Sequence, residues 1–175
     1  MKYLKVILIS IFSASIILSC GTAHNYSSKG LNKNLYEGKT FYFSLNPQSK
    51  QEIKLSGLHG TILGPYRPPN IEETFVLALK ELTSETGISL QYIGNAEASD
   101  DIKPFLFDTT ISEISWHFGF SVATLKTVTN FKNVFNSKEL ETSGIRKSGG
   151  GDEMNNLKKS LKDATFNFLK AYDQH

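Results

Sequence analysis

The sequence predicts an α+β domain, and three observations support this fold class. Between residues 40 and 131 the chain contains short alternating runs rich in aromatic and β-branched residues, which are typical of strands. Two segments, 70–87 and 152–172, instead repeat apolar residues at helical spacing. Because strands and helices are not regularly interleaved, we expect a mainly antiparallel sheet of about five strands, covered on one side by the two helices.

The first strands are predicted from alternation. Residues 40–45 place Phe41, Phe43 and Leu45 on one face, and residues 51–55 and 88–93 alternate in the same way. The Gly/Pro-rich segment 57–69 is predicted as a long connection, with a short strand over 61–63 as an alternative.

Residues 102–131 are predicted to form two further strands. Ile111 and Ile114 differ in parity although both are apolar, which indicates a β-bulge near 112–113. Gly119 is expected at the bend between the strands. Residues 136–151 are expected to be a mobile loop, because three consecutive glycines at 149–151 are incompatible with regular structure.

Both helices have recognisable ends. Asn70 is a good N-cap with Glu73 three residues later, and Gly87 is suited to the C-terminal position that follows the last turn. Asp152 is the predicted N-cap of the second helix. One face of that helix is apolar, and the opposite face is expected to lie in water through four lysines: Lys158, Lys159, Lys162 and Lys170.

The N-terminus has the pattern of an export signal. Two lysines precede an apolar run from Val6 to Leu18, which is too short for a comfortable membrane span. The sequence Ile17-Leu18-Ser19-Cys20 resembles the lipobox of bacterial lipoproteins. The resemblance implies cleavage of residues 1–19 and acylation of Cys20, palmitate included. The alternative is an ordinary secretory signal that happens to contain a cysteine.

The resemblance also implies a location. Gly21 is not the aspartate that retains such lipoproteins in the inner membrane, so we expect a lipid anchor in the outer membrane, facing the periplasm. Residues 20–39 are polar and are predicted to be the lipidated N-terminus and a flexible tether. A single α+β domain is then expected over residues 40–175.

Composition excludes several functions. The formal net charge is +2, and Lys2 and Lys5 of the expected signal peptide account for all of it, so the remaining chain gives no electrostatic case for nucleic-acid binding. Cys20 is the single cysteine, which excludes an intrachain disulfide and a cysteine-based metal cluster. No motif predicts a cofactor or a metal.

No catalytic signature is present in the sequence. Of the four histidines, His24 and His175 lie near the ends of the expected mature chain, so a two-histidine metal site would require His59 and His117. Neither spacing nor nearby carboxylates favour it. A hydrolase that pairs one of these histidines with a carboxylate remains an alternative. The remaining candidates for chemistry have equally good structural interpretations: Asp100, Asp101, Asp108 and Glu113.

The best candidate binding residues are Tyr66 and Arg67. They lie between glycine and prolines in a stiffened loop, and their residue types are enriched at interface hot spots. The alternative is a rigid lead-in to the first helix, with Tyr66 packed on the core. Trp116, Phe118 and Phe120 could form a sugar-stacking platform, although aromatic residues on a strand usually belong to the core.

The order of elements loosely resembles the small α/β domains of periplasmic lipoproteins that accompany envelope transport or assembly machines. The resemblance implies a non-enzymatic, membrane-anchored component that binds an envelope protein. Two alternatives stay open: a module that binds a small apolar or glycan ligand, and the hydrolase described above. Nothing in the sequence determines the oligomeric state.

Overall fold

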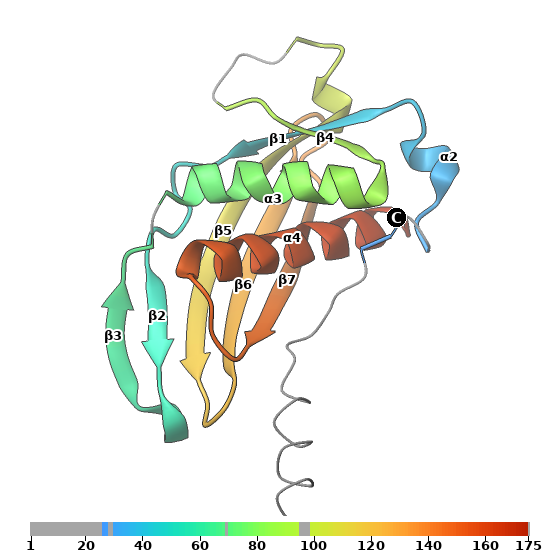
Figure 1. Ribbon diagram of the computed structural model, residues 1–175. Helices are drawn as coiled ribbons and strands as arrows, with labels where there is room; N and C mark the ends of the chain where they lie inside the picture. The colour runs from blue at the N-terminus through green and yellow to red at the C-terminus, as the bar shows by residue number, and fades with distance from the viewer. Residues whose placement is uncertain (1–25, 28–29, 69, 95–98, 175) are drawn as a thin grey trace, which may run out of the picture.

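The computed structural model describes residues 26–27, 30–68, 70–94 and 99–174. Cys20 and the expected signal peptide lie outside the described residues. Three α-helices and seven strands occur in the described part (Figure 1). The helices are α2 (Lys33–Tyr36), α3 (Ile71–Thr86) and α4 (Glu153–Tyr172). The strands are β1 (Thr40–Leu45), β2 (Ile53–Ser56), β3 (Ile62–Tyr66), β4 (Ser89–Tyr92), β5 (Leu106–Phe118), β6 (Ala123–Asn133) and β7 (Glu139–Ser148).

The α+β class is confirmed, but the predicted sheet is wrong in two respects. It has seven strands rather than about five, and it is mixed rather than mainly antiparallel. Strand β5 pairs in parallel with β1 along its first half and with β2 along its second half, and β1 pairs in parallel with β4. The pairs β2–β3, β5–β6 and β6–β7 are antiparallel. Alternation alone reveals a buried face, not the direction of the neighbouring strand.

Strand β7 lies where a mobile loop was expected, so that prediction is wrong for residues 139–148. The strand has few apolar residues because its outer edge and one face are covered by α4 through polar contacts. Asp163 Oδ2 accepts a hydrogen bond from Ile145 N at 2.8 Å, and Asn167 Nδ2 donates to Ser143 O at 2.9 Å. These side chains satisfy edge groups that would otherwise be open to pairing.

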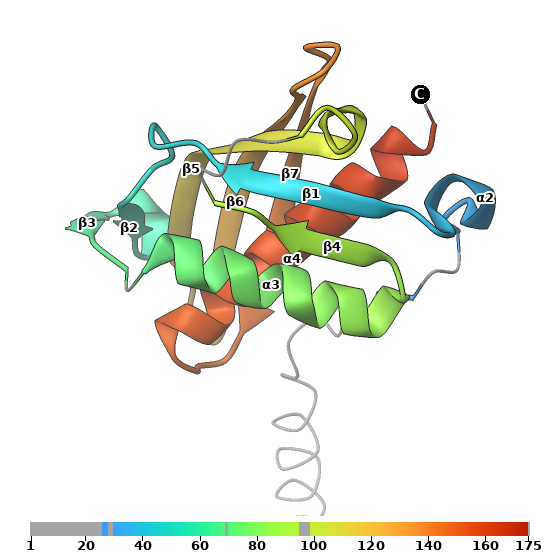
Figure 2. The same cartoon turned by 90° about the horizontal axis from the view of Figure 1, so that it is seen from above.

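Helices α3 and α4 pack against each other on the same side of the sheet (Figure 1), and α4 crosses β1 and β4 obliquely (Figure 2). The expected caps are present: Asn70 Oδ1 accepts from Glu73 N, and Asp152 Oδ1 accepts from Asn155 N. The core between the layers is strongly aromatic. Phe43 contacts the rings of Phe75, Phe107, Phe131 and Phe168, with centroid distances from 5.8 to 6.3 Å.

One lysine does not lie where its helical position predicts. Lys162 was expected in water, but its side chain is only 4% exposed and pairs with Glu81 and Glu85 of α3. The expected β-bulge is confirmed, because the β5–β6 register shifts between Ile111 and Glu113.

Part of the expected tether packs on the domain. Tyr26, Leu31 and Tyr36 are all buried and belong to the hydrophobic core. The Tyr26 hydroxyl donates to Asp163 Oδ1 at 3.2 Å, and the Tyr36 hydroxyl donates to the carbonyl oxygen of Leu169. The packed structure therefore begins before Thr40, at least as early as Tyr26.

Candidate functional site

A groove lies between α2, the end of α3 and the start of β4. Its volume is about 520 Å³, which lies in the range of small-molecule and peptide side-chain sites. We call it the α2–α3 groove, and define it by ten residues: Leu31, Tyr36, Glu37, Gly38, Lys39, Thr40, Thr86, Gly87, Ile88 and Ser89.

Two sharp turns form the walls of the α2–α3 groove. Gly87 ends α3 in the left-handed conformation with φ of 73°, which a side chain rarely adopts. Thr86 then fixes the exit of the chain, because its hydroxyl donates to Leu82 O at 2.7 Å and accepts from Ile88 N at 3.2 Å. Gly38, with φ of 71°, makes the corresponding turn between α2 and β1.

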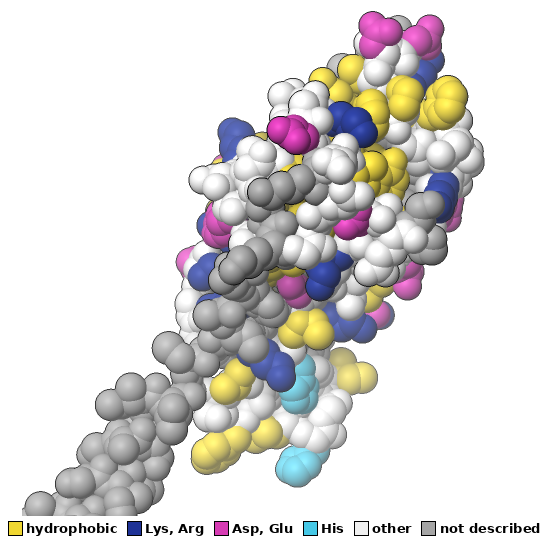
Figure 3. All heavy atoms as spheres, turned by 90° about the vertical axis from the view of Figure 1, so that its right-hand side faces the viewer, with side chains coloured by type: hydrophobic (Ala, Val, Ile, Leu, Met, Phe, Trp, Pro, Cys, Tyr) yellow, Lys and Arg dark blue, Asp and Glu magenta, His cyan; other side chains and the backbone are white. Residues whose placement is uncertain are grey.

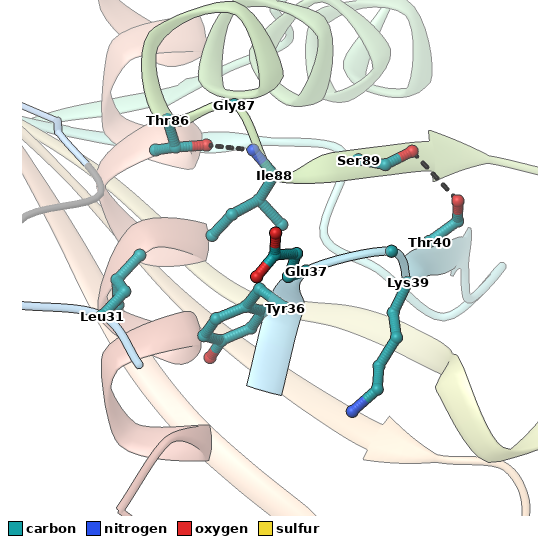
Figure 4. Close-up of a pocket in the computed structure, with 10 residues that line it drawn as sticks. Leu31, Tyr36, Glu37, Lys39, Thr40, Thr86, Gly87, Ile88 and Ser89 are labelled. Atoms are coloured by element: carbon teal, nitrogen blue, oxygen red, sulfur yellow. Dashed lines mark hydrogen bonds between the residues drawn. The ribbon is translucent and has the colours of Figure 1, made fainter. Parts of the chain in front are cut away.

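The floor of the groove is apolar and its rim is polar. Leu31, Tyr36 and Ile88 face the same hollow in Figure 4. Burial raises the pKa of Tyr36 well above its ordinary value, with the charge of Asp173 as a secondary cause, so the phenol stays neutral and keeps its bond to the helix backbone. On the rim, Thr40 Oγ1 donates to Ser89 Oγ at 3.1 Å, and Lys39 extends over the ring of Phe105.

This arrangement suits the binding of an apolar group. A half-open hollow with a neutral phenol and aliphatic side chains can hold an apolar group, and Glu37 and Lys39 offer both signs of charge to whatever surrounds that group. Among the described residues that line the groove there is no histidine or cysteine.

A smaller cavity of about 280 Å³ lies where β1 and β4 end and α3 begins. Asn46, Gln51 and Asn70 line it together with Glu72 and Tyr92. Burial raises the pKa of Tyr92 to about 12, and the hydrogen bond to the Glu72 carboxylate acts in the same direction. The tyrosine is therefore a hydrogen-bond donor at neutral pH, not a base.

The predicted binding residues Tyr66 and Arg67 do not line either cavity. Tyr66 is the last residue of β3, pairs with Ile53 of β2 and packs partly against the core. Arg67 is exposed directly after the strand. The sequence left two interpretations of this loop open, a binding site and a rigid lead-in to the first helix. The packing of Tyr66 against the core is the feature expected for the lead-in to α3.

His59 and His117 lie at one end of the molecule (Figure 3), and neither is paired with a carboxylate of the described residues. His117 Nδ1 lies 3.1 Å from Ser56 Oγ, and His59 occupies an exposed turn with φ of 58°. Within the described ranges, no group of three His, Cys, Asp or Glu side chains is placed to hold a metal ion. Neither histidine lines the two cavities described above.

The carboxylates singled out from the sequence are dispersed. Asp108 accepts hydrogen bonds from Asn46 Nδ2 and Ser44 Oγ, and Asp100 pairs with Lys103 Nζ at 2.7 Å. The hydrogen bond and charge of Lys103 lower the pKa of Asp100, which is fully exposed. Asp101 is exposed as well, and Glu113 lies on β5 beyond the bulge.

The three aromatic residues do not form one platform. Trp116 is 8% exposed and its ring lies tilted against that of Phe118 at a centroid distance of 4.9 Å, so both contribute to packing. Phe120 lies beyond the end of β5 and is 94% exposed.

Sequence reasoning missed the groove because residues 30–39 were interpreted as tether. The available signal was the apolar spacing of Leu31, Leu35 and Tyr36, which places all three near one side of a short helical turn. Four residues of helix are too few for periodicity to stand out against a polar segment.

Comparison with known proteins gives little further information. No family model and no curated protein matches the chain. Among solved structures, the chain is similar to one titled "Crystal structure of uncharacterized protein", with 6% identity and a TM-score of 0.32. The match covers 78% of this chain and 98% of that one. No helix in the described part of the chain is long and apolar enough to cross a membrane.

Proposed function

We propose that the chain is an envelope lipoprotein, anchored through acylated Cys20 in the outer membrane, whose domain binds a partner protein without catalysing a reaction. The α2–α3 groove is the observation that supports binding most directly. Its apolar floor, polar rim and volume of about 520 Å³ fit an apolar side chain of a partner together with its flanking peptide.

The anchor is supported by the lipobox-like residues 17–20, and the distance from Cys20 to the packed domain is short. Only residues 21–25 separate Cys20 from the buried Tyr26. A fully extended chain between these two residues spans about 20 Å, so an acylated Cys20 would hold the domain close to the bilayer. A partner in the same membrane would then be met at high effective concentration.

The first experiment tests the anchor. Cells that express the tagged full chain are supplied with a clickable palmitate analogue, and the chain is isolated and examined for label. We expect label in the wild type and none in Cys20→Ala. Label on neither protein would contradict the lipoprotein assignment.

The second experiment tests the groove. A photo-crosslinking amino acid is placed at Glu37, which is exposed on the groove rim, and in a control protein at Glu141, which is exposed on β7. We expect a discrete crosslinked envelope protein from position 37 and not from position 141. The same bands from both positions, or none from either, would contradict a partner in the groove.

A small apolar or glycan ligand is the second candidate, because the groove volume also fits a ligand of that size. A ligand that binds only the folded state raises the midpoint of thermal unfolding in a concentration-dependent way. We expect that response in the wild type but not in Ile88→Asp, if the groove holds such a molecule. A response unaffected by Ile88→Asp would place the ligand elsewhere.

A further inference from the structure

Large apolar side chains are exposed at one end of the sheet, at the turns of two hairpins. Ile62 is 83% exposed and Leu63 56%, both at the start of β3, and Leu58 is 48% exposed in the preceding turn. Phe120, in the turn between β5 and β6, is 94% exposed. We call these four residues the apolar tip. Figure 3 shows apolar side chains and two histidines gathered at one end of the molecule.

The strand register brings the two turns together. Strands β2 and β5 run parallel, with Leu55 opposite Trp116 and Ser56 opposite His117. Strand β2 ends at Ser56 and strand β5 ends at Phe118, within two residues of these pairs. The β2–β3 turn and the β5–β6 turn begin there. The ends of the two hairpins therefore lie beside each other (Figure 1), and their exposed apolar residues belong to the same end of the molecule.

Folding does not require large apolar residues at these positions. The β5–β6 turn is closed by the hydrogen bond from Gly119 N to Val122 O, and a Cβ at Gly119 would lie 2.7 Å from that oxygen. The Phe120 side chain is not needed to close this turn. Turns ordinarily contain small or polar residues. Apolar residues that gather on an exposed surface mark an interaction site more often than residues scattered singly.

Charges on the outer face of the sheet, opposite the helices, are segregated along the strands. The register places Lys54, Ser115 and Lys126 in one row on this face, and Lys147 follows in the next row toward the turns. Glu113 lies on the same face, one row further from the turns than Ser115. At the far end of the same face, Asp108, Lys132 and Glu139 form a row, and Glu141 lies in the row beside it. The basic end is therefore the end that contains the apolar tip.

This combination fits one occupant, a phospholipid bilayer. Apolar side chains that protrude from rigid turns can enter the acyl region, while nearby lysines meet anionic headgroups, each with an attraction that weakens with salt. The far, more acidic end of the face would point away from the surface. An anchored domain must present some side to the membrane, because about 20 Å of chain at most separates Cys20 from Tyr26.

We propose that the apolar tip inserts into the bilayer that holds the anchor, with Lys54, Lys126 and Lys147 facing its anionic headgroups. The inference rests on the proposed anchoring at Cys20. Insertion of the apolar tip would give the tethered domain a fixed orientation on the membrane. The α2–α3 groove lies at the ends of α3 and β4 that are far from the apolar tip, so it would stay available to a partner.

Trp116 provides the readout, because it is the single tryptophan of the chain and its ring contacts Phe118, the last residue of β5 before the β5–β6 turn. The full chain is reconstituted into phosphatidylcholine–phosphatidylglycerol vesicles with or without bromine atoms on the acyl chains. Bromine quenches tryptophan fluorescence only at short range. We expect Trp116 to be quenched in the brominated vesicles, and less so when salt is raised or phosphatidylglycerol is omitted.

Paired variants complete the test. Phe120→Ser and Ile62→Asn alter side chains that are almost fully exposed, so both proteins should fold, and we expect each to lose most of the quenching. Phe135→Ser removes an exposed phenylalanine at the opposite end of β6 and should leave quenching unchanged. Absence of quenching in the wild type, or equal quenching in all four proteins, would overturn the proposal. Crosslinking of the apolar tip to a protein with Trp116 unquenched would assign the surface to that protein instead.

Failure of this proposal can be told apart from failure of the anchor. The apolar run from Val6 to Leu18 or an acylated cysteine keeps the full chain on the vesicle in either case, whereas Trp116 reports only the position of the tip. Palmitate labelling at Cys20 without quenching would reject insertion of the tip alone. Quenching without labelling would reject acylation alone.

Discussion

The ammonium group of Lys162 lies 2.7 Å from the Glu81 carboxylate and is almost completely withdrawn from solvent. The same ammonium lies 2.8 Å from Glu85 Oε1 and 4.8 Å from the centre of the Tyr26 ring. A single α4 side chain thus joins α3, α4 and the N-terminal segment. Lys158 contacts the second oxygen of Glu81 at 2.6 Å, so the two lysines share one carboxylate.

Lys162→Ala should destabilise the fold by about 2 kcal/mol, because it removes a nearly buried ammonium from Glu85 and leaves Glu81 paired with Lys158 alone. Urea unfolding of the two proteins gives this difference directly. Lys159→Ala is the matched control on the same helix, since Lys159 makes no ion pair within the described residues, and it should change the free energy of unfolding by less than about 0.5 kcal/mol. Equal effects of both substitutions would contradict a special role for Lys162.

Stability should fall in acid partly through Glu81. Burial acts to raise the pKa of this carboxyl, but the hydrogen bonds and charges of Lys158 and Lys162 outweigh it and hold the pKa below the ordinary value of 4.5. The folded state therefore binds this proton less tightly than the unfolded state does. The stabilisation that the Glu81 carboxylate provides is complete when the pH is above the ordinary pKa. It disappears as the pH falls through the lowered pKa of the folded state.

The corresponding measurement is the free energy of unfolding of the wild type and Glu81→Gln between neutral and acid pH. The variant should be less stable at neutral pH and should lose less stability on acidification, so the two curves converge. Glu141→Gln, at an exposed position on β7, should follow the wild-type curve. Parallel curves for the wild type and Glu81→Gln would show that Glu81 does not contribute to acid sensitivity.

Gly144 is required where α4 crosses β7. A Cβ at this position would lie 1.8 Å from the carbonyl oxygen of Ser160 and 2.5 Å from Ala164 N, both backbone atoms that cannot turn aside. Gly144→Ala should therefore lower the free energy of unfolding by about 1–3 kcal/mol or more. Gly57→Ala is the control, because its Cβ would meet only Leu63, at 3.7 Å. Similar losses in both variants would contradict close helix–strand packing as the cause.

Gly144 also illustrates why β7 was missed from sequence. The strand pairs with β6 over ten residues, yet its sequence shows no clear alternation. Besides this ladder, the backbone of the strand contacts α4 directly, as in the hydrogen bond from Ser160 Oγ to Gly144 O at 2.9 Å. A glycine and polar residues are what such close contact needs, but in a linear sequence they suggest a loop.

Helices α3 and α4 were predictable because their signals are local. Asn70, Gly87 and Asp152 occupy the cap positions that their sequence neighbours indicate. Strand direction and the start of the domain depend on contacts between distant residues, such as Tyr26 with Asp163. The groove combines both difficulties, because Leu31 and Tyr36 acquire their apolar environment only when they meet α4 and the α3–β4 turn.

Tyr26 should contribute to stability although it precedes the first predicted strand. Its ring packs edge-on against Phe166 at a centroid distance of 5.2 Å and covers the Lys162 ammonium, and its hydroxyl contacts Asp163. Burial, reinforced by the charge of Asp163, raises the pKa of Tyr26 far above its ordinary value, so the neutral phenol is maintained. Tyr26→Ala should lower the free energy of unfolding by about 3 kcal/mol, and Tyr26→Phe should lower it by about 1 kcal/mol.

Urea unfolding of both variants, with Ser27→Ala as the neighbouring control, tests this order of effects. A flexible tether up to residue 39 would make all three substitutions neutral. A loss of stability that is largest for Tyr26→Ala, smaller for Tyr26→Phe and smallest for Ser27→Ala would instead place the domain boundary before Tyr26. It would also place the start of the packed domain within six residues of Cys20, a span of about 20 Å at most, which would keep the domain close to the membrane.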